Sequence, residues 1–428
     1  MEQNFKEKAL MDFFDFKKDR LYCEEVDVNK IADEVGTPVY IYSARTLQDH
    51  YRKLDTAFES IDHLICYSIK TNSNIAVLRL MVREGAGFDI VSSGELYRAV
   101  QAGADAGKIV FAGVAKTEDE VREAIKNDIL FFSVESIQEL ERIDRIAGEL
   151  GKRARFSIRV NPDVDPHTHK NITTGKLENK FGLDVEMTLK AYGQSLDLEH
   201  VEAVGLQMHI GSQLVSDEPF IEAIEKVKPL IGKIRKLGIE LRYFDIGGGL
   251  GVVYNNEKPT TAKQFAEDIL PLVSDLGLTL VLEPGRFIAA NAGILVTQVQ
   301  YIKKNPVKRF VIVDAGMNDL MRPLLYDSYH RIISTMSNSE NMIKADVVGP
   351  ICESTDVFAA DREIPEVNQG DYLALMTAGA YCASMSSNYN SKPKAAEVLV
   401  VDDKYYLIRQ RESEAELIKN ESIPEFLK

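Results

Sequence analysis

The chain has 428 residues, of which 45% are hydrophobic and 27% are charged, enough for a large buried core and for two or more domains. Its 66 acidic and 51 basic residues give a net charge of −15, which argues against a nucleic-acid-binding surface of clustered lysines and arginines. The four cysteines form no CxxC pair, the N-terminal stretch has no apolar signal-peptide core, and no run approaches the roughly 20 apolar residues of a membrane span. These features predict a cytoplasmic protein with reduced thiols that binds neither nucleic acid nor membranes.

Short apolar, β-branched runs alternate with amphipathic helical stretches through the first two thirds of the chain. Glu118–Lys126 and Ser136–Leu150 carry apolar residues at helical spacing with charges on the opposite face. Strands that alternate with helices predict a parallel sheet, and eight such units over about 220 residues suit a closed (β/α)8 barrel. A doubly wound open sheet is the alternative that strand counting leaves open. The eight expected strands are His63–Ser68, Gly87–Val91, Ile109–Ala112, Ile129–Ser133, Arg155–Val160, Ala203–His209, Arg242–Ile246 and Leu278–Glu283.

The connection between the fifth and sixth strands, about 40 residues, is longer than usual, and connections of that length in compact domains are usually functional. It contains His167 and His169, an H-x-H pair that could bind a metal ion. No third ligand with suitable spacing is evident, so we expect no metal site and interpret this segment as a mobile lid over the active site.

After Pro284 the pattern changes to strands with few long helices, which predicts a separate β-rich domain. We therefore expect an α/β chain with a barrel over residues 36–288 and a β-rich domain made of 1–35 and 289–428. The opening 35 residues could join either part by pattern alone. The strands expected in the second domain are Leu295–Lys303, Arg309–Asp314, Ile343–Val348, Tyr372–Met376, Glu397–Val401 and Lys404–Arg409.

Reactive side chains follow one expected barrel strand after another. The active site of a parallel barrel lies at the C-terminal ends of its strands, so these side chains are expected on one rim. Each has an ordinary explanation when taken singly, such as a solvated loop lysine or a helix-capping glutamate, but their joint position predicts a site. They are Lys70 after the first strand, Asp89 and Ser92 after the second, Arg159 and Asn161 after the fifth, His209 and Ser212 after the sixth, Gly247–Gly249 after the seventh, and Glu283 and Arg286 after the eighth.

The glycine run Ile246–Gly251 (IGGGLG) follows a strand, where backbone N–H groups can approach a phosphate, although a tight turn is the ordinary alternative. Val252 occupies the last glycine position of the dinucleotide fingerprint, and no Gly-Lys-Ser/Thr follows, so a single phosphate group is the ligand that remains. A barrel with such a site, Lys70 and an opposed acid such as Glu283 indicates pyridoxal phosphate (PLP). That cofactor needs a lysine for its Schiff base and an acid or arginine beside its pyridine nitrogen. His209 could lie against the ring, and a core histidine is an equally good interpretation of it.

An ordered set of motifs resembles the fold-type III PLP decarboxylases, relatives of alanine racemase that combine a barrel with a β-domain. The resemblance extends from about Pro38 to Val398, and the ordered set is specific although single motifs such as GAY are weak. Met317–His330 (MNDLMRPLLYDSYH), Asn161–His169 and Asn179–Gly182 look like the diaminopimelate decarboxylase branch of that family. The other motifs are CYSIKTN (Cys66–Asn72), HIGSQ (His209–Gln213), GGGLG (Gly247–Gly251), EPGR (Glu283–Arg286), CESTD (Cys352–Asp356) and GAY (Gly379–Tyr381).

The resemblance implies roles for individual residues. Lys70 would hold PLP, and Cys352 would donate a proton, with His209 completing the catalytic group. In the family the CESTD residues come from the neighbouring subunit, so a homodimer with shared active sites is implied. The implied cofactor-binding residues are Lys70, Asp89, His209, Ser212, Gly247, Gly248, Gly249, Glu283, Pro284, Gly285, Arg286 and Tyr381, and the implied substrate-binding residues are Arg286, Arg322, Tyr326, Glu353 and Tyr381.

The implied reaction is the decarboxylation of meso-2,6-diaminopimelate to L-lysine and CO2, the last step of lysine biosynthesis. This substrate ends in a second amino-acid group, which needs an acid for its ammonium and a cation for its carboxylate. Glu353 would supply the acid, and Arg286 and Arg322 the cations. One alternative is a related decarboxylase that acts on ornithine, arginine or carboxynorspermidine. The other is a non-catalytic PLP carrier, and the CESTD and GAY motifs of the β-domain argue against this second alternative.

Overall fold

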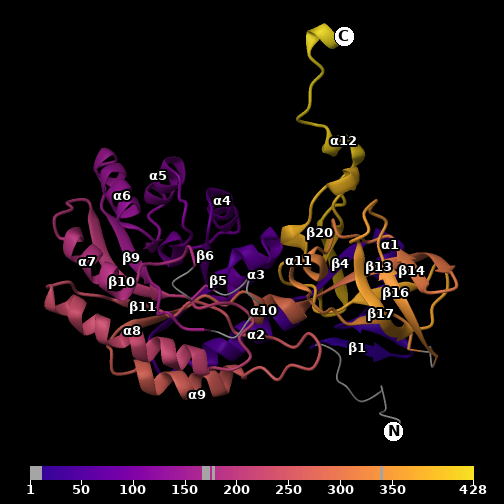
Figure 1. Cartoon of the computed structure of the whole chain (residues 1–428), viewed down its shortest axis with the longest axis horizontal. Coiled ribbons are helices and arrows are strands. Elements are labelled where there is room, and N and C mark those ends of the chain that lie inside the picture. The colour runs from indigo at the N-terminus through magenta and orange to yellow at the C-terminus, as the bar shows by residue number, and fades with distance from the viewer. Residues whose placement is uncertain (1–11, 166–173, 176–178, 338–340) are drawn as a thin grey trace. The chain divides into compact units, whose positions relative to one another are not determined.

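The computed structural model describes residues 12–165, 174–175, 179–337 and 341–428, so the expected lid with His167 and His169 lies outside the described residues. The chain divides into two units (Figure 1). One is Leu47–Ile288, and the other combines Met1–Thr46 with Ala289–Lys428. Residues 36–46 therefore lie in the second unit and not in the barrel, where we expected them, because their strand pairs with the strands of the β-sheet.

The first unit contains a closed barrel of eight parallel strands, as the sequence predicted, and the open-sheet alternative is wrong. The strands adjoin in chain order, and the first pairs with the last to close the barrel. The strands are β5 (His63–Ser68), β6 (Gly87–Ile90), β7 (Ile109–Phe111), β8 (Phe131–Val134), β9 (Ala154–Val160), β10 (Val201–Met208), β11 (Tyr243–Asp245) and β12 (Thr279–Leu282).

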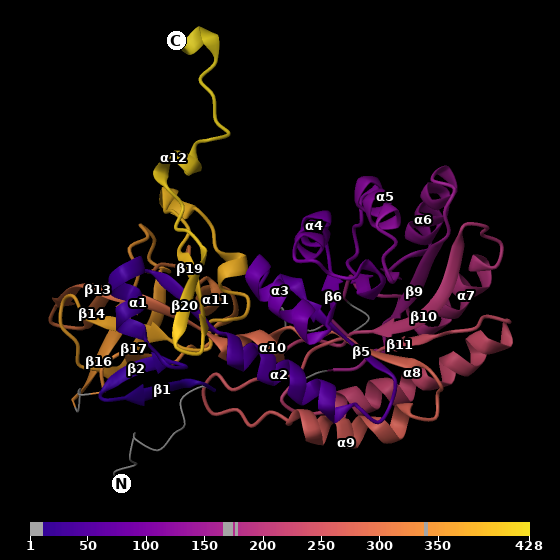
Figure 2. The ribbon, with the colours of Figure 1, turned by 180° about the vertical axis from the view of Figure 1, so that it is seen from behind.

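Helices follow the strands and cover the outside of the barrel (Figures 1 and 2). The predicted helix Glu118–Lys126 is confirmed residue for residue as α5. Thr117 begins it with a capping box to Glu120, and its apolar face is buried. The helices of this unit are α2 (Ala44–Ala57), α3 (Ile75–Glu84), α4 (Ser93–Gln101), α5, α6 (Ile137–Glu149), α7 (Val185–Ser195), α8 (Glu218–Lys236), α9 (Ala262–Val273) and α10 (Arg286–Ala289), of which α2 begins and α10 ends just outside the unit's bounds.

The interior of the barrel changes from apolar to polar toward the C-terminal ends of the strands. Because side chains two residues apart on a strand share a face, the change can be followed along individual strands. The apolar layer nearer the N-terminal ends of the strands packs as one cluster, and the polar residues nearer the C-terminal ends line the mouth of the barrel. The successive inward pairs are Cys66 and Ser68 on β5, Phe131 and Ser133 on β8, Tyr243 and Asp245 on β11, and Val281 with Glu283 at the end of β12.

The second unit is built on a nine-stranded sheet with the order β17-β16-β14-β13-β4-β19-β20, to which β15 and β18 are joined. A separate three-stranded sheet has the order β1-β2-β3. The strands are β1 (Phe14–Lys17), β2 (Arg20–Cys23), β3 (Val26–Asp27), β4 (Val39–Ser43), β13 (Gly293–Lys304), β14 (Arg309–Val313), β15 (Ile332–Ser334), β16 (Met342–Val348), β17 (Val357–Pro365), β18 (Tyr372–Leu375), β19 (Ala396–Val401) and β20 (Lys404–Arg409), and the helices are α1 (Val28–Val35), α11 (Arg322–Tyr326) and α12 (Glu414–Leu417).

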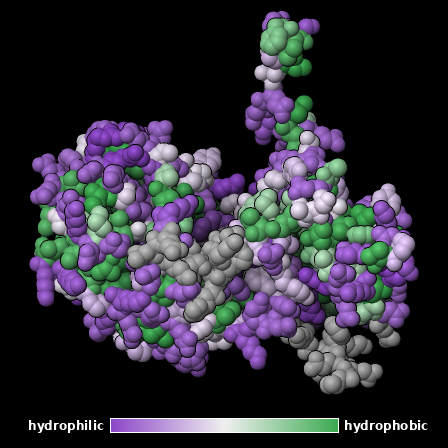
Figure 3. Space-filling model, in the orientation of Figure 1, coloured by the Kyte–Doolittle hydropathy of each residue, from purple (hydrophilic) through white to green (hydrophobic). Residues whose placement is uncertain are grey.

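The C-terminal residues after α12 expose large apolar side chains, and the apolar atoms at that end of the chain are visible in Figure 3. Among the described residues, no helix is both long enough and apolar enough to cross a membrane. The exposed residues at this end are Ile418, Ile423, Phe426 and Leu427.

Candidate active site

Lys70 lies in a single 3-10 turn, Ile69–Thr71, directly after β5. Its Nζ is 2.7 Å from Oδ2 of Asp89, an entirely buried residue at the end of the neighbouring strand β6. Ser68 donates a hydrogen bond of 2.6 Å to the same oxygen. The Lys70 side chain is 38% exposed, so the barrel mouth presents an amine that is held by a buried carboxylate and still accessible to a ligand.

Two further acids, Asp245 and Glu283, lie buried at the ends of β11 and β12. Gln207 Nε2 donates to Glu283 Oε2 at 3.5 Å. Loss of hydration and the nearby Asp245 and Asp89 carboxylates raise the pKa of Glu283 well above its ordinary value, and burial raises the pKa of Asp245 to about 7. Glu283 Oε1 is buried and accepts no hydrogen bond from the described residues, so it could accept one from the protonated ring nitrogen of a ligand.

The glycine run after β11 brings its backbone against the barrel wall. A Cβ atom at Gly248 would lie 2.0 Å from the carbonyl oxygen of Glu283, so only glycine fits this approach. Gly247 has φ of +72°, a left-handed conformation that favours glycine, and Asp245 Oδ1 accepts a 2.8 Å hydrogen bond from its N–H. The turn therefore has the close-packed backbone that a phosphate cradle requires.

His209 follows β10 and faces this turn. Its Nδ1 accepts a 3.2 Å hydrogen bond from the N–H of Gly248, so Nδ1 carries a lone pair and a neutral ring would have its proton on Nε2. Burial, the Arg159 guanidinium and the Lys70 ammonium all lower the pKa of His209 well below its ordinary value. The imidazole is therefore neutral at physiological pH and suited to packing against an aromatic ring.

Arg286 and Ser212 meet at the same mouth. Arg286 donates to Ser212 Oγ from Nε at 3.2 Å and from Nη2 at 3.0 Å, and from Nη1 to Tyr254 Oη at 2.6 Å. Pro284, between Glu283 and Arg286, accepts a 3.1 Å hydrogen bond from the N–H of Ser68, which fastens this loop to β5. Sequence reasoning missed Tyr254, whose only signal was its position shortly after the glycine run.

The remaining residues noted on the rim have structural partners. Arg159 forms a buried ion pair with Glu135, with Nη1 3.1 Å from Oε1. Glu135, which sequence reasoning also missed, accepts a 2.7 Å hydrogen bond from the N–H of Gly182 through its other oxygen. Ser92 caps α4 by accepting from the N–H of Glu95, and Asn161 donates to the carbonyl of Phe181. Ser92 and Asn161 thus support the local backbone.

The CESTD segment is a loop of the second unit in which residues 352–355 are exposed and Asp356 is buried. Cys352 and Glu353 are both exposed, and the N–H of Cys352 donates to Asn390 Oδ1 at 2.8 Å. The Thr355 hydroxyl and the Tyr389 hydroxyl, the latter at 2.7 Å, donate to Glu353 and lower the pKa of its carboxyl. This loop presents a thiol and a charged carboxylate to solvent.

Arg322, at the start of α11, is buried within the second unit. Its Nη1 donates to His330 Nε2 at 2.9 Å and its Nη2 to Ser328 Oγ at 3.2 Å. His330 Nδ1 donates in turn to the carbonyl of Met376 at 2.9 Å, which defines a neutral tautomer. Tyr326 ends the same short helix, and Tyr381 of the GAY motif has φ of +58°. The predicted site residues therefore form two groups. The residues of the barrel mouth belong to the first unit, and those of the CESTD loop, α11 and the GAY motif belong to the second unit.

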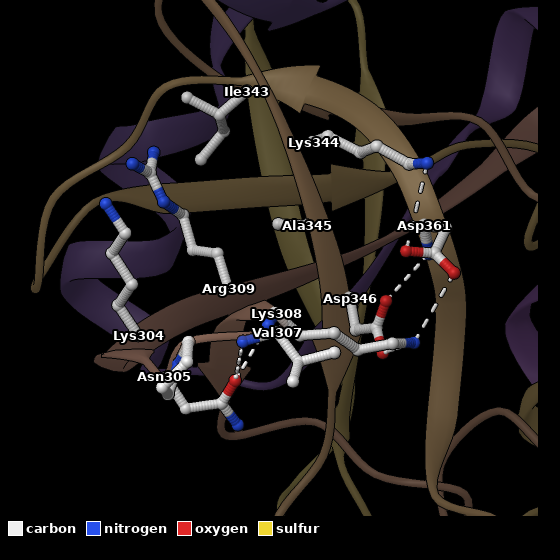
Figure 4. A pocket seen from close by; sticks show the side chains of 11 residues that line it. Lys304, Asn305, Val307, Lys308, Arg309, Ile343, Lys344, Ala345, Asp346 and Asp361 are labelled. Atoms are coloured by element: carbon white, nitrogen blue, oxygen red, sulfur yellow. Dashed lines mark hydrogen bonds and ion pairs between the residues drawn. The ribbon is translucent and has the colours of Figure 1, made fainter.

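A hollow of about 460 Å³ in the second unit is lined by several cations (Figure 4). Lys308 is paired with Asp346 at 2.8 Å and with Asp361 at 3.5 Å. Lys344 Nζ lies 4.0 Å from Asp361 Oδ1, and Arg309 Nη1 lies 3.6 Å from Glu366 Oε1. These pairs compensate much of the positive charge, so the hollow is a surface ion-pair network.

The barrel mouth fits PLP on its own geometry: an accessible lysine, a buried acid with an unsatisfied oxygen, and a turn that only glycine can form. The fold and this site define the class of PLP-dependent barrel enzymes. The sequence model of the family described as pyridoxal-dependent decarboxylase, pyridoxal binding domain, matches residues 44–290. The chain therefore belongs to the pyridoxal-dependent decarboxylases, and PLP is its cofactor.

Similarity to individual proteins extends over nearly the whole chain. The diaminopimelate decarboxylase of Haemophilus influenzae is 48% identical over 415 residues, which cover 96% of this chain and 100% of that protein. The crystal structure of the M. jannaschii diaminopimelate decarboxylase with L-lysine has a TM-score of 0.94 at 39% identity, covering 98% of this chain and 100% of that one. The Helicobacter pylori enzyme with L-lysine has a TM-score of 0.89 at 44% identity, covering 92% and 99%. Within the family, the chain belongs to the diaminopimelate decarboxylases, as its motifs indicated.

Proposed function

We propose that the protein removes CO2 from meso-2,6-diaminopimelate and releases L-lysine. The observation that carries this proposal is the cluster of Lys70, Asp89 and Glu283 in a chain that matches a diaminopimelate decarboxylase over that relative's full length. The alternative of a non-catalytic carrier does not apply to a member of this enzyme family. The alternatives with ornithine, arginine or carboxynorspermidine differ in what must be bound at the far end of the substrate.

The residues of the barrel mouth would hold the cofactor. The accessible Lys70 amine would bind it covalently, the unsatisfied Glu283 Oε1 would accept from its pyridine nitrogen, and the neutral His209 would pack against its ring. When bound, PLP supplies an electron sink for the pair left on the α-carbon as CO2 departs. The phosphate would be held by the Ser212 hydroxyl and by the backbone N–H groups of Gly247, Gly248, Gly249, Gly285 and Arg286.

Proton transfer falls to two groups. Asp89 accepts from Lys70 Nζ and can take its proton, which leaves the neutral amine that a nucleophile requires. Cys352 Sγ, which is exposed on the CESTD loop, would donate its proton to the substrate's α-carbon after CO2 has left. A thiol suits this step because it must still carry its proton when the carbanion forms.

Substrate selection depends on the two ends of diaminopimelate. Its distal carboxylate needs a cation, for which Arg322 and Arg286 are proposed, and its distal ammonium needs an acid, for which Glu353 is proposed. Arginine suits the carboxylate because its planar guanidinium can donate two parallel hydrogen bonds. Tyr326 and Tyr381 would complete the contacts with the substrate.

The proposed substrate predicts a specific pattern of CO2 release. With PLP added, kcat/KM for CO2 release is expected to be at least about a hundredfold higher with meso-diaminopimelate than with ornithine, arginine or lysine. The reason is that these amino acids bring no distal carboxylate to the Arg322 guanidinium, and the loss of such a charged hydrogen bond typically costs several kcal/mol. The measurement is kcat/KM for each amino acid from the evolved CO2. A preference for ornithine would exclude the substrate assignment while leaving the decarboxylase assignment intact.

We further propose a homodimer in which Cys352 and Glu353 of one subunit complete the site around Lys70 of the other. Support comes from the exposure of the CESTD loop and from the accessibility of the Lys70 amine. Mixing inactive Lys70→Ala with inactive Cys352→Ala subunits is expected to restore up to about a quarter of the wild-type activity. Random exchange makes half the dimers mixed, and each mixed dimer has one intact site of two.

The control for this mixing is each variant alone, carried through the same subunit-exchange step. Exchange is verified independently with differently tagged subunits. If mixed dimers form and activity stays at the level of the single variants, the sites are not shared between subunits.

A further inference from the structure

Asp245 and Glu283 belong to adjacent parallel strands and point to the same side of the barrel wall. Asp245 on β11 pairs with Val281 on β12, and Glu283 follows Val281 by two residues, so both acids face the interior. Both are buried, with exposures of 0% and 5%. The barrel therefore places two carboxyl groups together where water cannot separate them.

Each carboxyl has one oxygen with a donor and one without. Asp245 Oδ1 accepts from the N–H of Gly247 at 2.8 Å, and Glu283 Oε2 accepts from Gln207 at 3.5 Å. Asp245 Oδ2 and Glu283 Oε1 are buried and accept no hydrogen bond from the described residues when both acids are ionised. A single proton between the two carboxyls satisfies both oxygens, since it makes one a donor to the other.

We propose that Asp245 is a positioning residue that shares one proton with Glu283 and, through Gly247, ties this acid pair to the glycine turn. This inference rests on the proposed role of Glu283 at the pyridine nitrogen. With a ring N–H bound, the shared proton would reside on Asp245, so that the Glu283 carboxylate would keep the pair's one negative charge and accept from the ring with a second lone pair. The same side chain fixes the start of the turn proposed to hold the phosphate, so the two ends of the cofactor site share one support.

Other charged and titratable groups face this pair and act on it. Asp89 raises the pKa of both acids, Arg159 lowers the pKa of Asp245, and Lys70 lowers the pKa of Glu283. Burial raises the pKa of the Cys66 thiol beneath them, and His209 lies across the glycine turn. All of these groups remain in the variants of the acid pair, so differences between variants report on the pair itself.

The first test uses the cofactor-free full-length protein. An acid whose folded-state pKa is raised stabilises the fold below its unfolded pKa, and this contribution is lost as the pH rises to the folded value. For Asp245 the window runs from its ordinary value near 4 to about 7. Asp245→Asn keeps an acceptor for the Gly247 N–H and gives Glu283 a fixed N–H donor. The decrease in Tm from pH 5 to pH 8 is therefore expected to be at most half of the wild-type decrease. A wild-type slope in Asp245→Asn overturns the shared proton.

The second test measures PLP affinity from the absorbance of the bound cofactor. Asp245→Ala removes both the Gly247 acceptor and the partner of Glu283, and a buried group left without its hydrogen bond costs at least about tenfold in affinity. Asp245→Asn is expected to lose less than about threefold. Wild-type affinity in Asp245→Ala overturns the tie between the acid pair and the cofactor site.

Asp319→Asn is the matched control, because Asp319 is a buried acid of the second unit whose pKa burial raises to about 7. It is expected to flatten the stability profile of the cofactor-free protein and to leave PLP affinity unchanged. Glu283→Gln separates this inference from the proposed function. Unchanged PLP affinity in Glu283→Gln would contradict the proposed role of Glu283 at the pyridine nitrogen. The shared proton of the cofactor-free protein would still be tested independently by the pH dependence of Tm in Asp245→Asn.

Discussion

Lys70→Ala is expected to abolish CO2 release and the visible absorbance of lysine-bound PLP together. The Lys70 amine is accessible at the barrel mouth and lies 2.7 Å from the Asp89 carboxylate that can take its proton. Another lysine at the C-terminal end of a strand, Lys116 after β7, is buried, and its ammonium donates to three acceptors at 2.6–2.7 Å. It is therefore unavailable as a nucleophile. The measurement is an absorbance spectrum of the PLP-treated protein with a parallel CO2 assay.

Lys70→Arg is the matched variant, because it keeps a positive charge beside Asp89 without an amine that can bond to the cofactor. It is expected to be as inactive as Lys70→Ala and to match the wild-type Tm more closely. Retention of both absorbance and turnover in either variant would show that a different lysine carries PLP.

Arg322→Ala is expected to lower kcat/KM for meso-diaminopimelate by at least about 30-fold, since removing one partner of a desolvated charge pair costs about 2–5 kcal/mol. Arg322 is buried, and its hydrogen bonds to His330 and Ser328 hold the guanidinium without neutralising it. PLP content is expected to stay at the wild-type level. Arg322→Lys is expected to recover little, because a single ammonium cannot donate two parallel bonds to a carboxylate.

Controls separate substrate binding by Arg322 from its contribution to folding. Ser328→Ala removes a hydrogen-bond partner and keeps the cation, so it is expected to change kcat/KM by less than about threefold. Slow turnover of L-lysine, which has no distal carboxylate, is expected to be no lower in Arg322→Ala than in the wild type. An equal loss for both substrates, or unchanged turnover of diaminopimelate, contradicts the assignment of Arg322 to the distal carboxylate.

Most of the barrel strands could be predicted from the sequence because each is a short local run of apolar, β-branched residues. β5 was predicted residue for residue, and the other barrel strands were within two residues at either end. The position of Lys70 after β5 and of Glu283 after β12 then followed from the rule that parallel strands end on one rim. Chemistry that depends on residue type and place along a strand was visible without knowledge of any contact.

The sequence by itself determined the alternation of strands and helices and, through its ordered motifs, the family and its PLP cofactor. It predicted a barrel but left an open sheet as the alternative. The tertiary structure alone decided which residues meet. We expected the segment that forms β4 to belong to the barrel because it precedes the barrel strands in the chain. It pairs instead with β13 and β19, which lie in distant parts of the chain. Glu135 and Tyr254 gain their roles only when folding brings Arg159 and Arg286 to them. Closure of the barrel also sets protonation, because the charge that two buried acids can carry depends on the distance between them and on the exclusion of water, and neither is encoded in the spacing of residues along the chain.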